Sequence, residues 1–131
     1  MSADIHDAGW SWVKAVGLCS VGKVFDELKL DLKRDVEERN GLLTAAEPYK
    51  FTSTPRNGDV IVSLDGNNRH HSVTFSMHTQ GITVRSDDGT TFEASLTLND
   101  EGECRYRVNG QECEPWQMRK RALWKLFFET A

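Results

Sequence analysis

The stretch that decides the fold spans residues 49–108 and reads YKFTSTPRNGDVIVSLDGNNRHHSVTFSMHTQGITVRSDDGTTFEASLTLNDEGECRYRV. Its short alternating segments are separated by residues that favour tight turns. The turn signals are Asn57-Gly58, Asp65-Gly66, Gln80-Gly81, Asp88-Gly89, Asn99 to Gly102 and Asn109-Gly110. Because these connections are too short for parallel crossovers, the stretch predicts an antiparallel β-meander of five to six strands. The expected strands are residues 49–54, 59–64, 71–77, 82–86, 91–98 and 103–108.

The alternation also predicts two unlike faces for this sheet. Large apolar side chains, among them Phe51, Val62, Phe75 and Tyr106, share one face. The other face receives mainly serine, threonine and arginine, and Ile61 is its main apolar exception. An antiparallel sheet with this pattern is covered on one face and solvated on the other.

The longest helix is expected at residues 20–40. Ser20 is a suitable N-cap, and Asn40-Gly41 is a signal for the end of a helix. The apolar side chains recur at helical spacing and form one stripe, which consists of Val21, Val24, Phe25, Leu28, Leu32 and Val36. We expect this stripe to pack on the apolar face of the sheet.

A C-terminal helix is expected at residues 115–128, because Pro115 suits the first turn of a helix. The pattern assigns to its apolar side Trp116, Leu123, Trp124, Leu126 and Phe127, and to solvent Met118, Arg121, Lys125 and Glu129. Residues 1–19 form an aromatic N-terminal segment. Around Trp10 and Trp12 the pattern fits both a strand and a helix, and a helical turn is slightly favoured.

Length and composition predict one α+β domain over residues 1–131, large enough for a real core. The net charge of -4 argues against a generic binder of nucleic acid or anionic membranes. Cys19, Cys104 and Cys113 are an odd set without CxxC spacing, and we expect free thiols. No segment has the pattern of a signal peptide or a transmembrane helix, so a cytoplasmic protein is expected.

The residues that could carry chemistry do not converge in the predicted sheet. His70 and His71 are adjacent and therefore point to opposite faces of a strand, and His78 also opposes His71. A metal site needs several ligands around one ion, which these pairs cannot supply. The serines of the meander lie on a flat polar face, and neither a nucleophile elbow nor a phosphate loop is present. We expect no catalytic residues, no metal site and no cofactor.

These observations favour a small non-catalytic binding or interaction module. It would act through the polar sheet face or the C-terminal helix, and its partner would be another protein or a second copy of the chain. The candidate interaction residues are Arg105, Arg107, Arg119, Arg121 and Lys125.

Two alternatives remain open. A long helix, a meander and a closing helix resemble the arrangement of helix-grip and cystatin-like folds, in which an apolar ligand can lie between sheet and helices. A carrier or enzyme of that kind would use as pocket residues Trp10, Trp12, His71, Phe75, Tyr106 and Trp116. The other alternative is weak nucleic-acid binding through the basic C-terminal helix. It is the least favoured, since the polar sheet face offers no aromatic ring on which bases stack.

Overall fold

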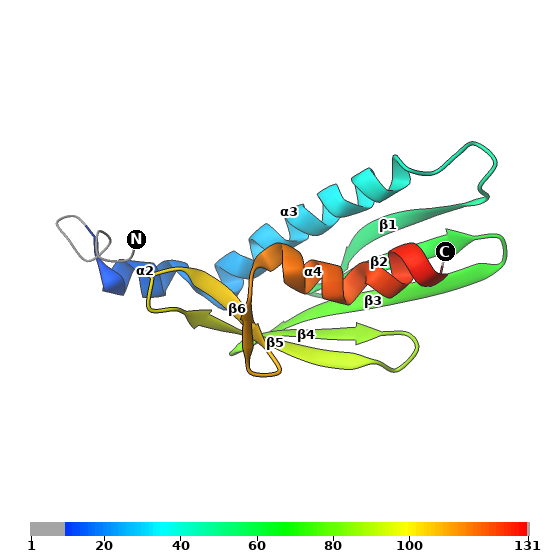
Figure 1. Ribbon diagram of the computed structural model, residues 1–131. Helices are drawn as coiled ribbons and strands as arrows, with labels where there is room; N and C mark the ends of the chain where they lie inside the picture. The colour runs from blue at the N-terminus through cyan, green and yellow to red at the C-terminus, as the bar shows by residue number, and fades with distance from the viewer. Residues whose placement is uncertain (1–9, 131) are drawn as a thin grey trace.

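Figure 1 shows the computed structural model, which describes residues 10–130 as a curved antiparallel sheet covered by helices. The helical elements are α2 (Trp12–Leu18), α3 (Val21–Asn40), α4 (Pro115–Trp124) and the π-helical turn η1 (Lys125–Thr130). The strands are β1 (Tyr49–Arg56), β2 (Asp59–Gly66), β3 (Arg69–His78), β4 (Gly81–Ser86), β5 (Thr91–Leu98), β6 (Cys104–Val108) and β7 (Gln111–Cys113). The expected α+β class is therefore confirmed.

The strands lie side by side in sequence order from β1 to β7, and every neighbouring pair is antiparallel. The sheet has one strand more than the expected maximum of six, because β7 follows the Asn109-Gly110 turn. Both turn residues have positive φ, as a two-residue hairpin turn requires. In this hairpin Val108 pairs with Gln111 and Tyr106 with Cys113, as the sequence predicts.

One turn lies elsewhere than expected. Asp65 and Gly66 continue β2, and the chain reverses at Asn67 and Asn68, which both have positive φ. Gly66 has a φ of 136°, and a Cβ atom there would collide with the backbone of the segment that leads into β1. Gly66 therefore allows two backbone segments to approach closely within the sheet. Asn67 and Asn68 form the turn, because asparagine tolerates left-handed backbone.

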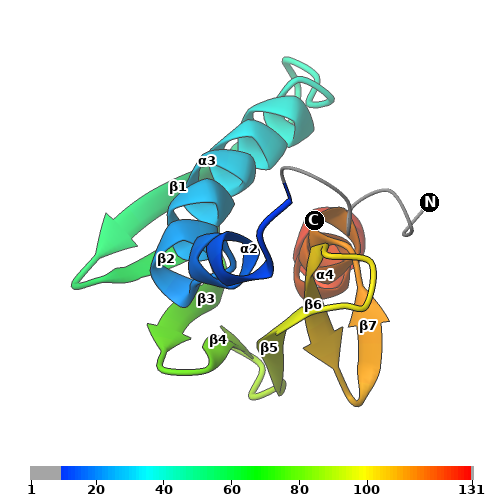
Figure 2. The same ribbon diagram turned by 90° about the vertical axis from the view of Figure 1, so that its left-hand side faces the viewer.

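Helices α3 and α4 cover the same face of the sheet (Figure 2). Figure 2 shows α3 over the β1 to β3 side and α4 over the β6 and β7 side, with the sheet curving beneath them. Buried apolar side chains from the helices and the sheet form one core between these layers. Its largest fully buried side chains are Phe51, Phe75, Leu32, Leu64, Ile82, Met118, Val60, Val62 and Val84. The predicted apolar face is confirmed at these sheet positions, whereas Met77 at the end of β3 is exposed.

The edge strand β1 is protected by a side chain of α3. Asn40, the last residue of α3, donates from Nδ2 to the Phe51 carbonyl oxygen at 2.8 Å and accepts from the Phe51 N–H at 2.9 Å. The carboxamide thus satisfies the same two groups that a neighbouring strand would satisfy. Pro55 lies farther along this edge and has no N–H to offer. Together they make β1 a poor template for pairing with another chain.

The N-terminal segment is helical from Trp12 to Leu18, which settles the choice between helix and strand. This helix buries none of its side chains, and Trp12 is 65% exposed, so Trp12 is not part of the core. Residues 1–9 of the predicted aromatic segment lie outside the described residues. Because α2 buries none of its side chains, a covalent bond is its main attachment to the sheet.

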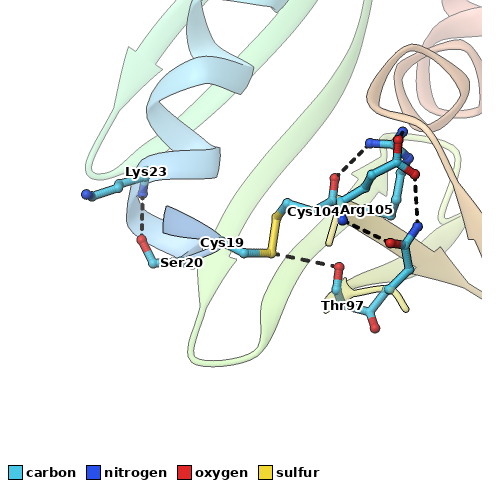
Figure 3. The surroundings of a disulfide bond; sticks show 8 residues. Cys19, Ser20, Lys23, Thr97, Cys104 and Arg105 are labelled. Atoms are coloured by element: carbon cyan, nitrogen blue, oxygen red, sulfur yellow. Dashed lines mark hydrogen bonds and ion pairs between the residues drawn. A yellow bond between two sulfur atoms is a disulfide. The ribbon is translucent and has the colours of Figure 1, made fainter. Parts of the chain in front are cut away.

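That attachment is a disulfide between Cys19, which follows α2, and Cys104 at the start of β6 (Figure 3). Their Cα atoms are 5.4 Å apart, within the range that a disulfide spans. The expectation of free thiols is wrong for both residues and holds for Cys113, which stays unpaired. The spacing of the cysteines in the sequence could not reveal that Cys19 and Cys104, 85 residues apart, are partners. Only the docking of the N-terminal segment brings Cys19 to β6.

Candidate functional site

A groove between α3 and α4 exposes several large apolar side chains. It has a volume of about 440 Å³. Leu42, Trp116, Trp124 and Phe128 are its exposed apolar side chains, and Leu123 and Phe127 form its floor. Charged groups line it as well, namely Asp35, Glu38, Arg39, Arg119 and Lys120. We refer to this surface as the aromatic groove.

The aromatic side chains of the groove lie outside the core because α4 is rotated from the orientation that the sequence predicted. Trp116 and Trp124, assigned to the apolar side, are 52% and 47% exposed, whereas Met118, assigned to solvent, is fully buried. The buried positions on this segment are Met118, Arg119, Ala122, Leu123, Leu126 and Phe127. These positions follow an i, i+1, i+4, i+5 pattern, which leaves Trp116, Lys120, Trp124 and Phe128 as one exposed stripe.

An ion-pair network fixes this rotation. Arg119 Nε lies 2.7 Å from an Asp35 carboxylate oxygen, and Nη1 lies 3.3 Å from Asp31. The arginine side chain is only 10% exposed, so the expectation that it remains a solvated interaction residue is wrong. A buried guanidinium requires carboxylate partners, and α3 supplies two of them from successive turns. The network joins α3 to α4 beneath the groove.

Further contacts hold the rings of the groove in place. Arg39 donates from Nε to the Phe127 carbonyl oxygen at 2.9 Å, and its guanidinium lies 5.2 Å from the centre of the Phe128 ring. Trp124 donates from Nε1 to Glu129 at 3.0 Å, and its ring lies 5.0 Å from that of Phe128. Aromatic side chains held in this way lose little conformational entropy when a ligand covers them.

The expected interaction residues separate into three groups. Arg107, Arg121 and Lys125 surround a second cleft of about 620 Å³ on the other side of α4, between this helix and β5. Arg105 instead pairs with Glu103 at 3.0 Å, and Arg119 belongs to the network with α3. The cations of the last helix therefore lie on different sides of it, with Arg119 and Lys120 at the aromatic groove and Arg121 and Lys125 at the second cleft.

Lys125 is tied to Asp88 at the rim of this second cleft. The ammonium lies 2.6 Å from the carboxylate, and this contact, with a hydrogen bond from the Thr90 N–H, holds the pKa of Asp88 well below its ordinary value of 3.8. A carboxylate whose pKa is lower in the folded than in the unfolded chain contributes stability when the pH is above its unfolded-state pKa. This contribution is lost as the pH falls through the folded-state pKa.

We therefore expect the Asp88→Asn variant to be less stable than the original chain at pH 7, because the amide loses the ion pair with Lys125. The difference shrinks below about pH 3.8, where the carboxylate of the unfolded chain becomes protonated. Urea unfolding of both chains at pH 7, pH 4 and pH 2.5 measures this difference. A gap of the same size at all three values would contradict the assigned role of the Asp88 charge.

The residues expected to line an inner pocket are not brought together. Phe75 and Tyr106 are buried in the core, and burial raises the pKa of the Tyr106 hydroxyl above its ordinary value. His71 lies 3.3 Å from Asp87, away from both core residues. Trp10 and Trp12 lie in the α2 segment, so that Trp116 alone of the six reaches the aromatic groove.

The two other histidines among the described residues each contact one carboxylate. His70 contacts Asp65, and His78 Nε2 lies 2.8 Å from Glu93. Within residues 10–130, three or more histidine, cysteine, aspartate or glutamate side chains do not gather as metal ligands would. Each of these contacts is a surface pair of one imidazole and one carboxylate.

Several groove residues were missed by reasoning from the sequence, namely Arg39, Leu42, Lys120 and Phe128. One signal was present, since Trp116, Lys120, Trp124 and Phe128 recur every four residues and so share one side of a helix. Such a stripe of aromatic residues is more often part of a core than exposed. Only the burial of Arg119 and Met118 on the neighbouring face shows which side of α4 is turned outward.

Comparison with protein-family models, curated proteins and solved structures gives no significant match for this chain. Among the described residues, no helix combines the length and the apolar character needed to cross a membrane.

Proposed function

We propose that this chain is a non-catalytic protein-binding module and that its working surface is the aromatic groove. The single observation that carries the proposal is the exposure of Trp116, Trp124 and Phe128 along one groove. Tryptophan is the residue most enriched among those that dominate binding energy at protein interfaces. A chain that buries Phe51 and Phe75 completely while leaving two tryptophans half exposed retains them for contact with another surface.

The shape of the groove favours an amphipathic helix as its occupant. Trp116 and Phe128 are twelve residues apart, which corresponds to about 18 Å along a helix axis. Two or three turns of a partner helix would cover that length with side chains at i, i+4 and i+7, the arrangement that helix-in-groove recognition uses. Lys120 lies within the stripe, with its ammonium 5.8 Å from the centre of the Trp124 ring. A carboxylate on the partner helix would therefore meet a cation there.

A small apolar ligand is the second candidate for the same groove. Its volume of about 440 Å³ falls within the range of about 300–1,000 Å³ typical of small-molecule sites. The helical occupant is preferred because the groove lies open along the helices and carries charge on both walls, with Glu38 on α3 and Lys120 on α4. Native mass spectrometry of the purified chain distinguishes the two, since a retained small molecule adds a discrete mass.

The disulfide bears on where such a module would work. Structural disulfides persist in oxidising environments and are rare in the reducing cytosol. We therefore favour an oxidising compartment over the cytoplasmic location that we expected from the lack of a signal-peptide or transmembrane pattern. Measuring free thiols under denaturing conditions, in protein isolated without reductant from its own cell, tests this placement. One reactive thiol supports it and three contradict it.

The proposal is tested by photo-crosslinking followed by sequencing of what is captured. A photoreactive phenylalanine analogue replaces Lys120 in the groove, and in a control chain it replaces Lys33 on the outer side of α3. We expect position 120, and not position 33, to capture one discrete partner segment with apolar residues at helical spacing. Equal capture at both positions, or captured segments without that spacing, would overturn the proposal.

The captured segment is then synthesised and titrated against the original chain and variants. Trp116→Ala combined with Trp124→Ala should weaken binding by about thirtyfold or more, corresponding to about 2 kcal/mol for one dominant residue. Trp12→Ala is the control, because Trp12 is also an exposed tryptophan but lies on α2, away from the groove. Since all three rings are exposed, thermal unfolding should change little, and a weakened complex then reports on contact and not on folding.

A further inference from the structure

The sheet is incomplete beside β5. The pairing of β5 with β6 covers only Ser95 to Leu98, and Ser95 opposite Arg107 is its last pair on the side of the β6–β7 turn. Thr91 to Ala94 are paired with β4 on one side. On their other side they are not paired with β6, because β6 ends at Val108 and turns into β7. The first half of β5 therefore forms an internal sheet edge.

The hydrogen-bond pattern shows which groups face this edge. The Leu96 N–H donates to the Gln80 carbonyl, and the Ser86 N–H donates to the Thr90 carbonyl, so even-numbered positions here are directed toward β4. The Asn99 N–H donates to the Glu103 carbonyl on the β6 side. Since alternate residues of a strand direct their backbone groups to opposite sides, Thr91 and Glu93 direct theirs into the space where β6 is missing.

That space is the second cleft, of about 620 Å³, which we name the β5 cleft. Val84 and Ala122, both buried, and the partly buried Phe92 form its apolar lining. The breadth of the cleft and the unpaired strand edge along it match what an added strand requires, namely backbone groups to pair with and room for alternate side chains.

Two arginines at the β5 cleft form no ion pair with a carboxylate of residues 10–130. Lys125 is paired with Asp88. The Glu93 carboxylate accepts hydrogen bonds from Thr83 and lies against His78, so it is already engaged.

Arg107 and Arg121 account for the rest of the charge. Arg107 donates only to the Gly110 carbonyl, at 3.4 Å, and the Arg121 guanidinium lies 5.3 Å from the centre of the Phe92 ring. Neither makes an ion pair with the described residues. The two come from opposite walls, since Arg107 lies on β6 and Arg121 on α4.

We propose that the β5 cleft binds an extended acidic peptide segment as an additional strand between β5 and α4. Its backbone pairs with Thr91 and Glu93, and two consecutive acidic residues, which point to opposite sides of a strand, meet Arg107 and Arg121. The site does not share a residue with the aromatic groove, so it stands or falls independently of the proposed function.

The test uses the peptide acetyl-Thr-Val-Glu-Glu-Val-Thr-amide as probe. Two comparison ligands are used, namely the same peptide with both glutamates replaced by lysine, and free glutarate. Two-dimensional amide NMR follows each titration, and hydrogen exchange is measured on the saturated sample. We expect the acidic peptide to bind, and the amides of Thr91 and Glu93 to exchange at least tenfold more slowly in its complex. The lysine peptide should not bind, and glutarate should leave the exchange of both amides unchanged.

Charge-reversal variants complete the test. Arg107→Glu and Arg121→Glu should each weaken binding of the acidic peptide by tenfold or more, while Lys33→Glu, with the same change in net charge on α3, should leave it unchanged. Thermal unfolding of each variant checks that the fold persists. Absence of binding to the original chain would overturn the proposal. Binding without protection of Thr91 and Glu93, or equal weakening by Lys33→Glu, would also overturn it and indicate a simple anion site or general attraction.

Discussion

Replacing Cys19 and Cys104 with serine is expected to lower the free energy of unfolding by about 3 kcal/mol, within the range typical for loss of a native disulfide. The bond closes a loop across 85 residues, so its removal releases a large part of the chain in the unfolded state. For a domain of this size the melting temperature should fall by about 10 °C. Thermal and urea unfolding with and without reductant measure both quantities.

The loss should be uneven along the chain. Because α2 buries no side chain, the amides of Trp12 to Leu18 should exchange fast in the double variant, while those of α3 stay protected. Cys113→Ser is the matched control, since Cys113 is unpaired and burial raises the pKa of its thiol. If Cys113→Ser lowers stability as much as the double variant, the disulfide is not the cause.

Removing the Arg119 guanidinium is the second change with a large expected effect. Arg119→Met should destabilise the fold by about 2–3 kcal/mol, less than the 3–5 kcal/mol found when a fully buried pair is broken. The smaller value is expected because Asp31 and Asp35 are 29% and 22% exposed and solvent screens part of their charge. Urea unfolding at neutral pH measures the change.

Two comparison variants show whether uncompensated charge causes this loss. Adding Asp31→Asn and Asp35→Asn to Arg119→Met should recover part of the stability, since no unpaired carboxylate then remains beneath the groove. Arg121→Met, two residues along α4 and exposed, should cost about 1 kcal/mol or less. Equal losses for Arg119→Met and Arg121→Met would show that the network with α3 contributes nothing specific.

Local patterns account for the parts of the fold that the sequence predicts well. The meander, its two faces and the register of the β6–β7 hairpin depend on alternation and turn residues, which act over a few positions. The bounds of α3 follow equally from local signals, because Ser20 caps its start and its apolar stripe has regular spacing. These features can be read from residues that lie close together in the chain.

The misjudged residues depend on partners far away in the sequence. Arg119 looks like a solvated cation until Asp31 and Asp35 are placed beside it, 88 and 84 residues away respectively. Cys19 looks like a lone thiol until the α2 segment reaches β6. Reasoning along the chain cannot find such contacts, since they depend on how α2 and α4 dock on the sheet.

The amino-acid sequence by itself determined an antiparallel meander with one apolar face, a long helix to cover that face and a second helix after Pro115. Only the tertiary structure decided which side of α4 faces outward and where the sheet stays open beside β5. The reason is physical. Alternation fixes the side of a strand on which each residue lies, whereas the rotation of a short helix follows from the ion pairs and packing that it finds. For α4, pairing of Arg119 with α3 turns Trp116 and Trp124 into solvent and so creates the candidate binding surface.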